Sequence, residues 1–82
     1  MKTEITKSIK EVAEEAAKRL VKCFSGRAEV RTYGNFADLF FDTNKHCTYT
    51  DIINEATVFA TMYGKRINHV YLAGTVVVQY FD

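Results

Sequence analysis

The two cysteines and two histidines of this 82-residue chain could act as nucleophiles, bases or metal ligands: Cys23, His46, Cys47 and His69. His46 and Cys47 are adjacent, and a nucleophilic thiolate needs a base close to it. Neighbours in a chain rarely face one another, however, and no third residue that would orient the base is identifiable. We therefore predict that the protein is not an enzyme and has no catalytic residues.

The same four residues have the types that can bind zinc, but their spacing matches no compact ligand pattern. Cys23 lies beside the apolar stripe of a predicted helix, where a small buried thiol is the ordinary interpretation. His69 falls on a predicted strand, as a packed or half-exposed histidine. The four glycines each fall where a helix ends or a hairpin turns, so none forms a phosphate-binding loop. We predict no metal and no cofactor.

Composition excludes several classes of protein. Eleven basic and ten acidic residues leave a net charge of +1, and no basic run is longer than Lys65-Arg66, so nucleic acid is not strongly indicated. No stretch approaches the roughly eighteen apolar residues of a membrane span, and the amino terminus lacks the apolar segment of a signal peptide. We expect a single domain over residues 1–82 in the cytoplasm, with reduced cysteines and no membrane contact.

The first predicted helix has apolar residues at every third or fourth position. We expect Thr3 to cap its start, and Ser25-Gly26 to end it with the glycine in the left-handed conformation. Its apolar stripe consists of Ile5, Ile9, Val12, Ala16, Leu20 and Phe24.

The second predicted helix follows Thr48, which forms a capping box with Asp51, and it ends at Gly64 after about fifteen residues. Its stripe consists of Ile52, Ala56, Phe59, Ala60 and Tyr63.

Between the helices, alternating residues around Gly34-Asn35 predict a hairpin with a two-residue turn. Such a turn determines the register. One face then pairs Thr32 with Ala37, Val30 with Leu39 and Ala28 with Phe41; the other pairs Tyr33 with Phe36, Arg31 with Asp38, Glu29 with Phe40 and Arg27 with Asp42. The first face is apolar and the second carries two opposite-charge pairs, which supports the register.

A second hairpin is predicted over residues 66–81, with its turn at Ala73-Gly74. Apolar residues occur on both of its faces, although a half-buried hairpin needs them only at alternate positions. Either the hairpin is covered on both sides within the domain, or one face is kept for a partner. Its apolar residues are Ile67, Val70, Tyr71, Leu72, Val76, Val77, Val78, Tyr80 and Phe81.

The order α-β-β-α-β-β predicts an α+β fold in which two helices pack on one face of a largely antiparallel four-stranded sheet. The order of the strands across the sheet is left open. A rival fold is weighed because residues 52–56, Phe59 and Lys65-Arg66 resemble the end of the central helix and the basic loop of a histone fold. That fold requires residues 40–50 to be helical, which Asp42, Thr43 and the threonines that follow argue against.

Aromatic and arginine side chains gather on the outer face of the first hairpin, where Tyr33, Phe36 and Phe40 lie beside Arg27 and Arg31. Single-stranded nucleic acid is bound by such faces, and protein interfaces are enriched in the same residue types. Acidic neighbours would repel phosphates, which favours a protein. The predicted binding residues are Tyr33, Phe36, Phe40, Arg31, Tyr71 and Tyr80.

These observations predict a small non-enzymatic protein-binding module that occupies a partner's surface or adds a strand to its sheet. A homodimer through the carboxy-terminal hairpin is expected. In size and character the chain is similar to phage- or mobile-element-encoded inhibitors of host defence complexes, including anti-CRISPR proteins, which implies steric blockade. The alternative is binding of RNA or single-stranded DNA through the aromatic and arginine face of the first hairpin.

Overall fold

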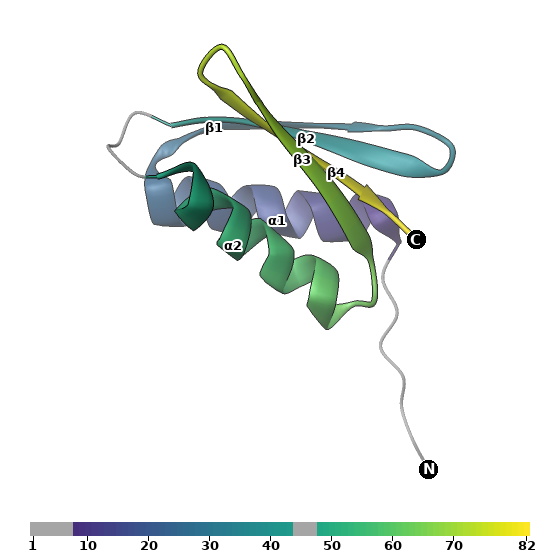
Figure 1. Cartoon of the computed structure of the whole chain (residues 1–82). Helices are drawn as coiled ribbons and strands as arrows, with labels where there is room; N and C mark the ends of the chain where they lie inside the picture. The colour runs from purple at the N-terminus through teal and green to yellow at the C-terminus, as the bar shows by residue number, and fades with distance from the viewer. Residues whose placement is uncertain (1–7, 44–47) are drawn as a thin grey trace.

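Two helices lie on one side of a four-stranded antiparallel sheet in the computed structural model of the chain (Figure 1). The structure describes residues 8–43 and 48–82. Along the chain the elements are α1 (Ile9–Phe24), β1 (Gly26–Thr32), β2 (Phe36–Thr43), α2 (Tyr49–Met62), β3 (Arg66–Leu72) and β4 (Thr75–Phe81). The predicted α+β fold and its element order are confirmed.

Helix α1 begins at Ile9 because Ser8 caps it. The Glu11 N–H donates to the Ser8 hydroxyl over 3.2 Å, and the Ser8 N–H donates to the Glu11 carboxylate over 2.9 Å. Ser8 itself has extended backbone angles, so the helix does not continue through it. The expected start after Thr3 is therefore wrong, and Thr3 lies outside the described residues.

Helix α1 ends at Ser25, whose φ of 52° lies in the left-handed region. Our expectation that Gly26 would take this conformation is wrong, because Gly26 is already the first residue of β1. The glycine is needed there for a different reason. A Cβ at position 26 would lie 2.0 Å from the backbone oxygen of Asp42 on the neighbouring strand, so a side chain would push the two strands apart.

The first hairpin has the predicted register throughout. Val30 lies opposite Leu39, and Arg31 lies opposite Asp38. At the turn, the Tyr33 N–H donates to the Phe36 oxygen over 2.8 Å. Because Phe36–Thr43 is a strand, the helix that a histone fold requires there is absent, and that rival is excluded.

The second hairpin turns at Ala73 and Gly74, as predicted. Their φ angles are 47° and 88°, and two successive positive φ values define a type I′ turn, whose twist matches that of the strands it joins. Glycine adopts this conformation freely. Alanine does so against a steric penalty of about 1 kcal/mol.

Pairing between β2 and β4 joins the two hairpins and produces the strand order β1-β2-β4-β3. Leu39 lies opposite Val78, and Ala37 lies opposite Tyr80. This antiparallel pairing answers the question that the sequence left open. It also makes β1 and β3 the two edges of the sheet.

The core lies between the helices and one face of the sheet. Helix α2, capped by Thr48 and Asp51 as predicted, and helix α1 bury small and branched side chains against β2 and β4. The helix side of β4 is therefore covered within the domain, whereas most of β3 remains exposed. The fully buried large side chains are Tyr80, Phe41, Leu20, Leu39, Val12 and Val78.

Gly26→Ala is expected to lower the free energy of unfolding by about 3 kcal/mol, because the added methyl group collides with a backbone oxygen. Gly34→Ala is the matched control: no atom lies within 4 Å of a Cβ built there. It should change stability by less than about 0.5 kcal/mol. Urea unfolding of both variants measures the difference, and equal effects would contradict the close approach of β1 and β2.

Ala73→Asn is expected to raise the free energy of unfolding by about 0.5–1 kcal/mol, because asparagine tolerates the left-handed conformation better than alanine. Ala73→Ser is the control, since serine keeps the steric penalty and should give no comparable gain. Urea unfolding checks both variants. A loss of stability in Ala73→Asn would mean that the turn is not type I′.

Candidate functional site

The face of the sheet opposite the helices is the candidate site, and we call it the open face. Successive residues of a strand point to opposite faces. Since Leu39 and Val78 are buried under the helices, their neighbours in the chain lie on the other side. Among the described residues, no element covers that side (Figure 1). The open face consists of Arg27, Glu29, Arg31, Phe36, Asp38, Phe40, Asp42, Arg66, Asn68, Val70, Leu72, Thr75, Val77, Gln79 and Phe81.

An aromatic row crosses the open face near the first turn. Phe36 of β2 lies opposite Phe81 of β4, which lies opposite Arg66 of β3. Tyr33, just before the turn, stacks on Phe36 with the ring centroids 4.7 Å apart. The Arg66 guanidinium lies 4.9 Å from the centroid of Phe81, in reach of a cation–π interaction. The row thus combines flat apolar surfaces with a cation at one end.

A polar row runs beside the aromatic row. Asp38 lies opposite Arg31 on one side and Gln79 on the other, and Gln79 lies opposite Asn68. The Gln79 amide donates to the Asp38 carboxylate over 3.2 Å. This row presents donors and acceptors that a partner's polar groups can meet.

An apolar row follows, made of Phe40, Val77 and Val70 in register. Arg31 reaches over from the polar row, with its guanidinium 5.3 Å from the centroid of Phe40. Val70 and Val77, together with Asp38 and the two amides of the polar row, line a shallow hollow of about 210 Å³. An aromatic row, a polar row and an apolar row thus follow one another along the strands of the open face.

The open face carries three arginines, Arg27, Arg31 and Arg66, and three carboxylates, those of Glu29, Asp38 and Asp42. Arg31 donates to Glu29 over 3.0 Å, and this hydrogen bond raises the pKa of the arginine above its ordinary value. Arg27 lies opposite Asp42. Arg66 donates to the backbone oxygen of Asp82 over 2.6 and 3.1 Å. The face therefore carries mixed charge and no concentrated positive potential.

Four of the six predicted binding residues lie together on this side of the sheet: Tyr33, Phe36, Phe40 and Arg31. Tyr71 does not join them. It lies on the helix side of β3, opposite the buried Val76, where it is 58% exposed and makes an edge contact with Tyr49 at 5.6 Å. The predicted set is thus divided between two sides of the sheet.

Tyr80 is wrong as a surface anchor, because it is fully buried in the core. Its hydroxyl donates to the backbone oxygen of Ala56 in α2 over 3.2 Å, and burial raises the pKa of the phenol. Its pairing with Ala37 places it on the helix side of the sheet. The aromatic residue of β4 on the open face is its neighbour Phe81, which we did not predict as a binding residue.

Sequence reasoning did not assign residues of the second hairpin to the open face, and Phe81, Val77 and Arg66 are among those it missed. Alternation along residues 75–81 divides them into two sets, but it does not say which set faces the helices. Both sets carry large apolar side chains, with Val76, Val78 and Tyr80 in one and Val77 and Phe81 in the other. Only the register of β4 against β2, in which Phe36 meets Phe81, assigns them.

Among the described residues, the other candidates from the sequence do not form a site. The Tyr49 hydroxyl and Nδ1 of His69 lie 2.6 Å apart on the helix side of β3, so His69 is engaged within the domain. Within residues 8–43 and 48–82, no group of three or more His, Cys, Asp or Glu side chains could hold a metal ion. His46 and Cys47 lie outside the described residues.

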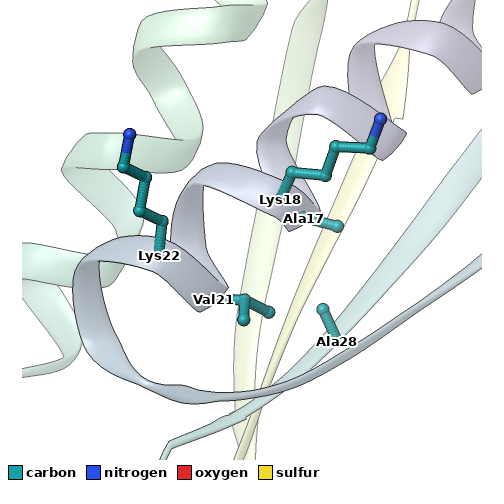
Figure 2. Close-up of a pocket in the computed structure, with 5 residues that line it drawn as sticks. All are labelled: Ala17, Lys18, Val21, Lys22 and Ala28. Carbon is teal, nitrogen blue, oxygen red and sulfur yellow. The ribbon is translucent and has the colours of Figure 1, made fainter.

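A further hollow of about 360 Å³ lies between α1 and the outer edge of β1. Figure 2 shows its floor of Ala17, Val21 and Ala28, with the chains of Lys18 and Lys22 diverging so that their ammonium groups do not meet over it. A small-molecule site needs polar groups that converge on the ligand. This hollow has none among the residues that line it.

Comparison with models of known protein families and with curated proteins found no match. Neither α1 nor α2 is long and apolar enough to span a membrane.

Proposed function

We propose that the chain is a non-enzymatic protein-binding module whose open face docks on a partner protein. The observation that carries the proposal is the arrangement of three alternating rows on a sheet face that the described helices leave uncovered. Aromatic residues and arginine are enriched in protein interfaces and supply most of their binding energy.

Row alternation supports a protein partner in particular. Phe36 and Phe40 lie on the same strand with Asp38 between them, and the hydrogen bond from Gln79 holds the carboxylate in place. A protein surface can place apolar groups on the two aromatic positions and a donor between them. Such an interface would act by occupying the partner's surface. Inhibitors of host defence complexes, to which the chain is similar in size and character, work in this way. That narrower role stays a prediction.

Single-stranded nucleic acid is the second candidate, because stacked aromatics beside arginine are what such binders present. The charges oppose it. Phosphate binding requires basic side chains that displace the counterions condensed on the nucleic acid. On this face Arg31 is bonded to Glu29, and Arg27 lies opposite Asp42.

The double substitution Phe36→Ala and Phe40→Ala is expected to raise the dissociation constant of the protein partner by at least about 100-fold, because it removes two aromatic anchors. Both side chains are only partly buried, so the variant should fold, which circular dichroism checks. The partner is captured from extracts of the producing cells, identified, purified and titrated by calorimetry.

Val58→Ala is the matched control for that titration. Val58 is 48% exposed, but it lies on α2, away from the open face. The control should change the dissociation constant less than about 2-fold. A partner whose affinity falls with Val58→Ala and not with the double variant would place the interface on the helices and end this proposal.

Nucleic acid binding is expected to be absent. An oligothymidine or oligouridine of about twenty nucleotides should show no saturable binding to about 100 µM protein at about 50 mM salt, measured by fluorescence anisotropy. Tight binding that weakens steeply as salt rises, and that Phe40→Ala abolishes, would favour the second candidate over a protein partner.

A further inference from the structure

We propose that the free edge of β3 pairs with the β3 edge of a second copy of this chain, which joins the two sheets into one antiparallel sheet. This inference concerns a different surface from the open face. It does not depend on the identity of any other partner.

Within the part of the chain that the structure describes, the β3 edge lacks the features that usually prevent edge pairing. Proteins protect exposed edges with charged side chains, prolines, bulges, very short strands or covering elements. β3 is seven residues long, its single charged residue Arg66 lies at its start, and the chain has no proline. Val70, Tyr71 and Leu72 are 45%, 58% and 57% exposed. In Figure 1 the turn end of this hairpin stands clear of both helices.

The opposite edge is different. β1 carries Arg27, Glu29 and Arg31 at alternate positions, and α1 runs directly into it through Ser25 and packs against it. Charged side chains and the packing of α1 thus protect the β1 edge, and the β3 edge has neither protection.

Hairpin geometry identifies the backbone groups that would pair. The two residues that flank a two-residue loop form backbone hydrogen bonds with one another. From there along the strand, the N–H and C=O groups of successive residues point alternately toward and away from the paired strand. Leu72 and Thr75 flank the loop at Ala73-Gly74, so Leu72, Val70 and Asn68 direct their groups toward β4. The N–H and C=O groups of Ile67, His69 and Tyr71 point outward.

A second copy fits this edge because the edge is complementary to itself. Antiparallel pairing about a two-fold axis at His69 places each Ile67 opposite the partner's Tyr71 and each Asn68 opposite the partner's Val70, so all three outward residues are paired. Cross-strand pairs of aromatic and β-branched residues are favourable. No like charges meet, because Arg66 lies opposite the partner's Leu72 and its guanidinium is bonded to the Asp82 backbone.

Tyr71→Pro compared with Tyr71→Ala tests the pairing. Both remove the same aromatic side chain, but only proline removes an outward N–H. Wild type and Tyr71→Ala should be dimers by sedimentation at about 100 µM, and Tyr71→Pro should dissociate at least about 10-fold more readily, because each dimer loses two backbone hydrogen bonds. Equal dissociation constants for the two variants, or a wild type that stays monomeric, would overturn the proposal.

Amide hydrogen exchange of the unmodified chain gives a second measurement that does not depend on the folding of the proline variant. The amides of Ile67, His69 and Tyr71 should gain protection as the protein concentration rises through the dimer range, while those of β1 should not change. Amides of β3 that exchange equally fast in monomer and dimer would overturn the proposal. Phe40→Ala should remain dimeric, so a failure of the edge and a failure of the open face are distinguishable.

Discussion

Antiparallel pairing between β2 and β4 is the interaction on which the rest of the structure depends. Each hairpin has its own register, but a hairpin alone does not determine which of its faces is buried. By placing Leu39 opposite Val78 and Ala37 opposite Tyr80, the central pairing aligns the two apolar sets on one side, where both helices can cover them. A shift of one residue would place Phe81, Gln79 and Val77 where Tyr80, Val78 and Val76 now lie.

The described elements leave a second apolar surface uncovered. Two helices form one layer over the four-stranded sheet, and residues 8–43 and 48–82 contain no further element that could form another. Phe36, Phe40 and Phe81 therefore have no helical cover. They are only partly exposed. Phe36 and Phe81 lie opposite one another, and the guanidinium groups of Arg31 and Arg66 lie over the rings of Phe40 and Phe81. Lateral packing of this kind makes an apolar face tolerable in water and keeps its rings in place for a partner.

The locally determined features of the fold are those that the sequence predicted correctly. The capping box at Thr48, both turns and the register of the first hairpin were all predictable, because each depends on residues close together in the chain. The errors arose where the structure depends on contacts between residues distant in the chain, or where two nearby residues are both suited to the same position. Ser8 and Thr3 are both capable caps. Tyr80 and Phe81 are both aromatic, and only contact with a strand some forty residues away decides which one is buried. The open face was thus predictable in its β2 half and not in its β4 half.

The proposed edge pairing and the proposed docking face affect one another through symmetry. A two-fold axis normal to the sheet keeps equivalent faces on the same side, so the dimer would carry two open faces in one continuous surface with all the helices behind it. Two equal faces at a fixed separation favour partners that present two matching surfaces, because the second contact is intramolecular once the first has formed. Dimerisation would then raise the apparent affinity for a symmetric or repetitive partner and leave the affinity for a single site unchanged. The β3 edge would thus contribute to the choice of protein partner without contacting that partner.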